Sequence, residues 1–136
     1  MSYSDFKNPT IFTDMKKVLV IEDNIVLREN TAEMLEVSGY KVQTAENGME
    51  GFNKVLKYQP DVVICDMMMP KVDGVGFLKL MKKDSATNKI PIVFFSAGTP
   101  GSQVRDHLTE HGDAYLKKPF TNEELLAAVG QFANFD

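Results

Sequence analysis

The sequence predicts an α/β fold, in which a parallel sheet is doubly wound with helices on both of its faces. Two kinds of segment point to this class: short apolar runs without polar alternation, and stretches whose apolar residues recur every three or four positions. Strands buried on both faces are typically continuous apolar runs, and parallel strands need helical crossovers. The two kinds of segment alternate five times, so we expect five βα units and a five-stranded parallel sheet.

The most apolar runs, residues 18–21, 62–65 and 92–95, predict three buried strands. The stretch 42–45 is more polar and alternates, which is typical of a strand at the edge of a sheet. Residues 114–116 predict a short last strand.

The segments between and after these strands predict amphipathic helices. The apolar and small residues that define them are, in chain order, Leu27, Thr31, Met34, Leu35 and Ser38; Phe52, Val55 and Leu56; Gly74, Phe77, Leu78 and Met81; and Leu125, Ala128, Val129 and Phe132. A further helix, roughly residues 103–110, has only Val104 and Leu108 as strong apolar anchors.

Short polar residues before three of these helices predict N-terminal caps, because their side chains accept hydrogen bonds from free backbone amides. The predicted caps are Asp23 or Asn24, Asp73, and Thr121 in a capping box with Glu124. Gly39 predicts the end of the first helix, Pro60 the end of the second, and the Asn47-Gly48 pair predicts a turn.

Composition bounds the class of protein. The chain has 136 residues, 43% of them apolar and 25% charged, which suits one domain, here residues 16–136 after an aperiodic tail of residues 1–15. With 15 basic against 19 acidic residues and no basic run, we do not expect direct nucleic-acid binding. No stretch approaches the ~20 apolar residues of a membrane span, and no signal peptide is evident. The single cysteine, Cys65, fits a reducing compartment, so we expect a cytoplasmic protein without membrane insertion.

Four of the five predicted strands end in a charged or reactive side chain. The first is followed by Glu22-Asp23, the third by Asp66 and the fourth by Ser96, and the last leads to Lys118. Carboxyl ends of parallel strands lie at one edge of the sheet, where open α/β folds bind ligands. Each residue alone has an ordinary explanation, as a helix cap, a turn hydroxyl or a solvated amine. Together, these residues at one edge of the sheet predict a functional site.

Three carboxylates close together repel one another and raise one another's pKa. A hard divalent cation relieves this repulsion, and an all-oxygen ligand set favours Mg²⁺, with Mn²⁺ as a substitute. The ion, an ammonium and a hydroxyl together suit a tetrahedral dianion. Because an aspartate can accept a phosphoryl group, the residues predict phosphoryl transfer onto Asp66.

Four short motifs follow one another along the chain: Glu22-Asp23, residues 66–70 with Asp73-Gly74 behind them, Ser96-Ala97, and residues 115–120. In this order, over about residues 15–135, they resemble the receiver domain of bacterial two-component response regulators, in particular the single-domain, chemotaxis-regulator type. The resemblance implies a flavodoxin-like fold with strand order 2-1-3-4-5. It also implies a cis peptide bond at Lys118-Pro119.

The resemblance implies a role for each matched acidic residue. Asp66 is the expected phosphoacceptor. Asp23 and Asp66 would bind Mg²⁺ directly, Glu22 would bind it through water, and Met68 would bind it through its backbone carbonyl.

Three further residues are expected to respond to the phosphoryl group. Lys118, rather than Lys117, would contact it, and Ser96 would hydrogen-bond one of its oxygens. Tyr115 would swing inward as that hydroxyl moves. These contacts would favour a second arrangement of residues 98–101 and the last two helices, and so switch a protein-interaction face.

The resemblance also implies the partners. A sensor histidine kinase or a histidine phosphotransfer protein would supply the phosphoryl group, and a downstream effector protein would bind the switched face. The domain would assist its own phosphorylation and dephosphorylation without being an enzyme, as a monomer or a phosphorylation-linked dimer.

Position 68 bears on two interpretations. A thioether cannot orient an attacking water, so Met68, two residues after the acceptor, predicts a long-lived acyl phosphate. A phosphatase with an aspartate nucleophile usually has a second Asp at this position, and Met68 is not one.

Two further interpretations of the chain stay open. It can be a receiver cut from a hybrid histidine kinase or from a longer regulator. His107, Glu110 and His111 also match the H-x-x-E-H pattern of a zinc peptidase, although the chain after them is short for a further ligand.

Overall fold

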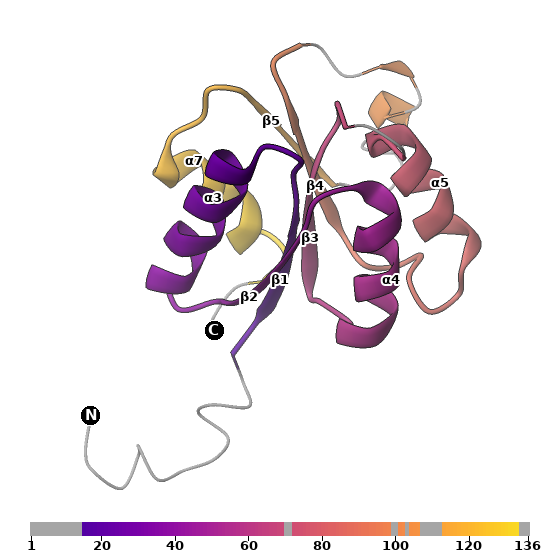
Figure 1. Cartoon of the computed structure of the whole chain (residues 1–136), viewed down its shortest axis with the longest axis horizontal. Helices are drawn as coiled ribbons and strands as arrows, with labels where there is room; N and C mark the ends of the chain where they lie inside the picture. The colour runs from indigo at the N-terminus through magenta and orange to yellow at the C-terminus, as the bar shows by residue number, and fades with distance from the viewer. Residues whose placement is uncertain (1–14, 70–71, 99–100, 103, 107–112, 134–136) are drawn as a thin grey trace, which may run out of the picture.

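A computed structural model describes residues 15–69, 72–98, 101–102, 104–106 and 113–133. It contains a five-stranded parallel sheet in the order β2-β1-β3-β4-β5 with helices on both faces (Figure 1). The α/β class and the order implied by the resemblance are therefore confirmed.

The strands match the apolar runs of the sequence to within a residue or two. Their bounds are β1 Lys17–Ile21, β2 Lys41–Ala45, β3 Val62–Asp66, β4 Ile92–Ser96 and β5 Ala114–Lys117. Every residue of β3 is buried, because this strand lies between β1 and β4 and is covered on both faces. Strand β2 alternates between exposed and partly buried residues and forms an edge of the sheet, as its polarity predicted.

The four helices that follow the predicted apolar spacing are α3 Ile25–Val37, α4 Gly48–Tyr58, α5 Gly74–Lys83 and α7 Asn122–Gly130. Helices α3 and α7 cover one face of the sheet, and α4 and α5 cover the other (Figure 1). Of the helix expected near residues 103–110, most lies outside the described residues, but Val104 is fully buried.

The sheet separates two hydrophobic clusters. Successive strand residues point to opposite faces, so Val18 and Val20 of β1 pack beneath α3 and α7, while Leu19 and Ile21 pack beneath α4 and α5. Within the described residues, no helix is both long and apolar enough to span a bilayer.

Local capping explains where the helices begin. The side chain of Asn24, rather than that of Asp23, accepts a hydrogen bond from the first turn of α3. Asp73 caps α5, and Thr121 and Glu124 form the predicted capping box of α7. These oxygens satisfy amides that have no partner inside the helix.

The chain bends at Glu46 and Asn47, between β2 and α4, and Gly48 is already the first residue of the helix. Asn47 is also the N-cap of α4, and its side chain accepts a hydrogen bond from the Glu50 amide, 2.9 Å away. Helix α3 ends as predicted: Gly39 has a φ of 102°, and its amide and that of Tyr40 bond back to carbonyls of the last turn. A side chain at this positive φ would be strained.

Gly48 offers a test of how closely α4 approaches the loop after β3. Its amide donates to the Val72 carbonyl at 3.2 Å, and an added Cβ would lie 2.4 Å from the same oxygen. We expect Gly48→Ala to lower the free energy of unfolding by about 1–3 kcal/mol, because a backbone carbonyl must move. Gly130→Ala, where nothing lies within 4 Å of the new atom, is the matched control and should be neutral or stabilising in urea unfolding.

Candidate functional site

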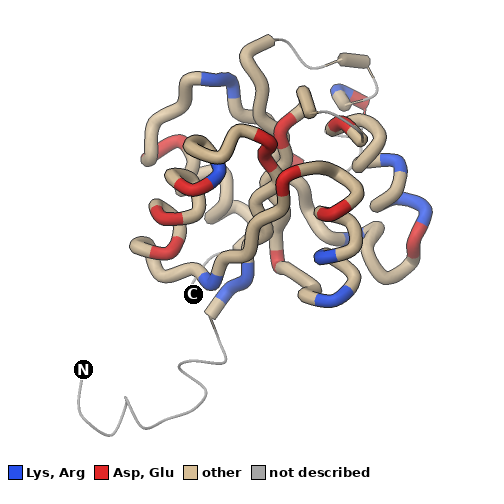
Figure 2. The backbone as a smooth tube through the Cα atoms, in the orientation of Figure 1, with Lys and Arg blue, Asp and Glu red and all other residues tan. Residues whose placement is uncertain are grey.

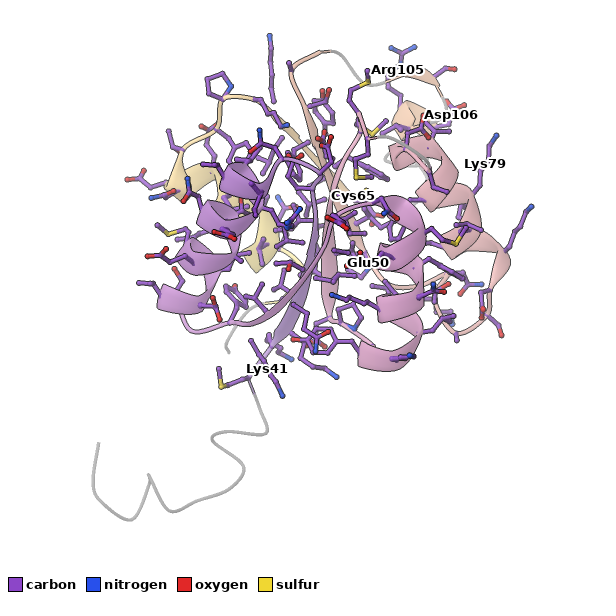
Figure 3. All side chains as sticks on the ribbon, viewed as in Figure 1. Lys41, Glu50, Cys65, Lys79, Arg105 and Asp106 are labelled. Atoms are coloured by element: carbon purple, nitrogen blue, oxygen red, sulfur yellow. The ribbon has the colours of Figure 1, made fainter. Side chains whose placement is uncertain are left out.

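The carboxyl ends of the central strands bring the predicted side chains to one edge of the sheet. Asp66 is the last residue of β3 and Ser96 the last of β4, while Glu22 follows β1 directly and Lys118 follows β5. In Figure 2, acidic residues gather at the upper end of the sheet, where the strands meet the loops. Cys65 lies one residue before Asp66, inside the sheet between the helical layers (Figure 3).

Glu22, Asp23 and Asp66 form a compact acidic cluster. One carboxylate oxygen from each lies within 4.8 Å of the others. Glu22 and Asp66 are almost completely buried, at 1% and 3% exposure, whereas Asp23 is exposed. The cluster therefore has two buried acids beneath one that reaches solvent.

Backbone amides hold the buried carboxylates in place. The Asn24 amide donates to Glu22 Oε2 at 3.1 Å, and the Met68 amide donates to Asp66 Oδ1 at 3.1 Å. Arg28 donates from its guanidinium to the Glu22 carbonyl at 2.9 Å, which fixes the turn between β1 and α3. In each buried acid one carboxylate oxygen thus accepts from a backbone amide, while the other faces the Lys118 ammonium.

Lys118 supplies the cation at this cluster. Its Nζ lies 3.2 Å from Glu22 Oε1 and 3.4 Å from Asp66 Oδ2, and it sits over the Phe95 ring at 5.0 Å from the ring centre. Its amide donates to the Ser96 carbonyl at 2.8 Å, and the bond to Pro119 is cis, as the resemblance implied. Lys117 is exposed.

Burial and, after it, the neighbouring acids shift the pKa of Glu22. Burial first, then the hydrogen bonds and charge of its acidic neighbours, raises the pKa of Glu22 from 4.5 to about 7, even with the Lys118 ammonium in contact. Burial also raises the pKa of the Cys65 thiol, so this cysteine is an inert core residue. Within the described part of the chain, the cluster therefore contains more negative charge than the contacting Lys118 ammonium neutralises.

Ser96 and Tyr115 meet at Gly98. The Gly98 amide donates to Ser96 Oγ at 3.4 Å, and the Tyr115 hydroxyl donates to the Gly98 carbonyl. Tyr115 is half-buried and packs against the cluster of hydrophobic residues beneath α4 and α5. The predicted switch residues are thus joined through one loop residue, while the acids and Lys118 form the other part of the site.

Some residues of the site were not predicted. Arg28 and Phe95 were missed, because a helix arginine and a strand phenylalanine carry no distinctive sequence signal. Gly74 was predicted as part of a motif and of a helix face, but not for its close packing: an added Cβ there would lie 2.8 Å from the Met67 Cα, so this glycine lets α5 approach the loop after Asp66. His107, Glu110 and His111 lie outside the described residues.

Comparison with known proteins gives a consistent family. A family model described as a response regulator receiver domain matches residues 18–130. The chain is 35% identical over 118 residues to the DNA-binding dual master transcriptional regulator RpaA of Synechocystis, covering 85% of this chain and 48% of that protein. It is 38% identical over 114 residues to the response regulator Rre1 of the same organism, covering 82% and 49%. The chain thus spans about half the length of the curated relatives it matches.

Solved structures show the same fold, and the match covers nearly the whole length of each of the following two. The chemotaxis protein CheY4 of Vibrio cholerae matches with a TM-score of 0.77 and 32% identity, covering 87% of this chain and 98% of that one. The receiver domain of the sensor histidine kinase PA1611 of Pseudomonas aeruginosa, which has a magnesium ion in its active-site cleft, matches with a TM-score of 0.76, covering 88% and 98%. At 23% identity, the second comparison concerns the fold alone.

The raised pKa of Glu22 predicts a pH-dependent stability. In the metal-free protein, ionising Glu22 costs more in the folded than in the unfolded state, so stability falls as pH rises from about 4.5 to about 7 and stays low above that. We expect Glu22→Gln to raise the free energy of unfolding at pH 8 by on the order of 1–3 kcal/mol, with most of the gain absent at pH 5.

Urea unfolding with a chelator present, at both pH values, measures this effect. Glu33→Gln, which changes an exposed residue of α3, is the matched control and should have little effect at either pH. An E22Q protein that is no more stable than the wild type at pH 8 would contradict the raised pKa of Glu22.

Proposed function

Since the chain belongs to the response regulator receiver domain family, we propose that it accepts a phosphoryl group on Asp66 in a two-component system. The observation that carries this proposal is the pairing of a buried Asp66 carboxylate with the Lys118 ammonium at 3.4 Å, beside two further acids. An ammonium at this place suits the negative charge of a phosphoryl group.

The residues present fit a divalent cation. Among the described residues, three carboxylates face one contacting ammonium and the pKa of Glu22 is raised, which leaves negative charge that a hard cation would neutralise. One oxygen from each of the three acids lies within 4.8 Å of the others, so a single divalent cation can reach more than one of them. We propose that Asp23, Asp66 and the Met68 carbonyl bind Mg²⁺ or Mn²⁺, with Glu22 acting through water. When bound, the ion neutralises phosphoryl oxygens.

The protein's own groups prepare Asp66 for the reaction. Because the Met68 amide holds Oδ1 and Lys118 faces Oδ2, the carboxylate is fixed in rotation with one oxygen directed at the ammonium. In the transfer, a carboxylate oxygen of Asp66 bonds to phosphorus while the bond from phosphorus to the donor's imidazole nitrogen breaks. Lys118 then exchanges part of its contact with Asp66 for a phosphoryl oxygen.

The loop after β4 connects this reaction to the surface. We propose that Ser96 turns from the Gly98 amide toward the phosphoryl group and that the Tyr115 hydroxyl leaves the Gly98 carbonyl as the loop moves. The existing hydrogen bonds of both side chains to Gly98 support this coupling. The population then shifts toward a second loop arrangement with a different partner surface.

Membership of the family supports a proposal for the wider setting. The phosphoryl donor is a sensor histidine kinase or a histidine phosphotransfer protein, the output is an effector protein, and the setting is the cytoplasm. Residues 16–136 form the receiver unit. The curated relatives are about twice as long, so a receiver belonging to a longer regulator or a hybrid kinase is the second candidate. Family membership does not favour the zinc peptidase.

Phosphorylation of the purified chain tests the proposal. Incubation with acetyl phosphate and Mg²⁺ should add one phosphoryl group, measured by intact mass, and a chelator should abolish the addition. Asp66→Asn should remove the acceptor, while Asp61→Asn, at the opposite end of β3, should leave the adduct in place. An adduct that persists in D66N would show that the acceptor residue is assigned wrongly. An adduct that forms equally with a chelator would show that the metal at this site is assigned wrongly.

Met68→Asn tests the predicted lifetime of the acyl phosphate. The side chain is 75% exposed beside the acceptor and has no group that can orient water. An amide at this position can, so we expect the phosphorylated variant to decay at least about threefold faster, a modest share of the usual effect of a positioned polar group. Decay of the adduct, followed by intact mass after removal of acetyl phosphate, gives the rate. An unchanged rate would contradict the predicted effect of Met68 on the lifetime of the acyl phosphate.

A further inference from the structure

The methionines of the chain differ widely in their exposure. Of the eight, Met1 lies outside the described residues. Met69 and Met81 are buried, at 9% and 1% exposure, while Met49 on α4 is 46% exposed and Met68 is 75% exposed. Oxidation of methionine by solutes follows access to the sulfur, so Met68 is the most reactive methionine of the described part of the chain.

Three consecutive methionines follow the acceptor, and only the middle one reaches solvent freely. Met67 packs against the hydrophobic cluster beneath α4 and α5, with its sulfur against Gly74. Met69 is part of the same cluster. Met68 instead uses its amide to hold Asp66 Oδ1 at 3.1 Å and projects its thioether outward. The exposed sulfur therefore stands on the residue that positions the acceptor carboxylate.

We infer that Met68 is a redox modification site, at which a hydroperoxide oxidises the thioether to a sulfoxide and thereby shortens the phosphorylated state. This inference rests on the proposed phosphorylation of Asp66. In the step, the sulfur gives two electrons to the peroxide, the O–O bond breaks, one oxygen bonds to sulfur, and the other leaves as water (with hydrogen peroxide) or as an alcohol (with an alkyl hydroperoxide). Methionine sulfoxide reductases reverse the change.

The effect follows from the polarity of the product. A thioether is a weak hydrogen-bond acceptor, whereas a sulfoxide oxygen is a strong one that hydrates readily. Placed two residues after the acceptor, it can accept a hydrogen bond from a water that attacks the acyl phosphate. The Met68 amide and carbonyl are unchanged by oxidation, so the capacity of Asp66 to become phosphorylated should be retained.

The experiment compares decay rates before and after mild oxidation of the full chain. The protein is treated with hydrogen peroxide, and the +16 Da product is located by peptide mapping. It is then phosphorylated with acetyl phosphate and Mg²⁺, and the adduct is followed by intact mass. We expect Met68 to be oxidised first and the decay to become about three- to tenfold faster, below the 10²-fold of a fully positioned base. Methionine sulfoxide reductase should restore the slow decay.

Matched variants identify the sulfur responsible, and each variant is compared with its own untreated sample. Met68→Leu should lose the response to peroxide, while Met49→Leu, which removes the other well-exposed methionine of the described residues, should retain it. Preferential oxidation elsewhere, or an oxidised Met68 with unchanged decay, would overturn the inference while leaving the phosphorylation intact. Failure of the untreated protein to form an adduct on Asp66 would instead overturn the proposed function, and this inference with it.

Discussion

Repulsion among carboxylates at the end of the sheet is the constraint on which the site depends. Glu22 and Asp66 are buried where two adjacent strands end, and neither can move away without breaking the amide hydrogen bonds that hold it. The Lys118 ammonium offsets part of this charge, which ties the loop after β5 to the two central strands. A buried cluster of like charges destabilises the metal-free fold. The same negative charge favours the binding of cations at this site.

Most of the fold could be predicted from hydrophobic pattern alone, because its strands are buried on both faces and its helices on one. The unbroken apolar run of residues 62–65 predicted a strand buried on both faces of the sheet. The Asn47-Gly48 pair shows where local rules are ambiguous, since asparagine favours both turns and helix caps, and only the packing of α4 against the loop after β3 decides. The strand order came from a family resemblance, because alternation of strands and helices permits several orders.

The acidic cluster and Lys118 could be predicted because parallel strands end at one edge. The supporting contacts could not, since they join residues that no sequence pattern links. Examples are the Phe95 ring beneath Lys118 and the guanidinium of Arg28 on the Glu22 carbonyl. The raised pKa of Glu22 likewise results mainly from burial, and burial depth is set by the whole fold rather than by neighbours in the chain.

The acidic cluster and Lys118 stand on strand ends and the loops beside them, while the helices mainly cover the two faces of the sheet (Figure 1). Arg28 of α3 is an exception, because its guanidinium donates to the Glu22 carbonyl. Most side chains on the outward faces of α3, α4, α5 and α7 therefore take no part in the contacts described for the acidic cluster. Substitutions on those faces can therefore alter what the domain binds while the acidic cluster and Lys118 stay unchanged. A fold divided in this way lets one chemistry diversify into many separate signalling routes.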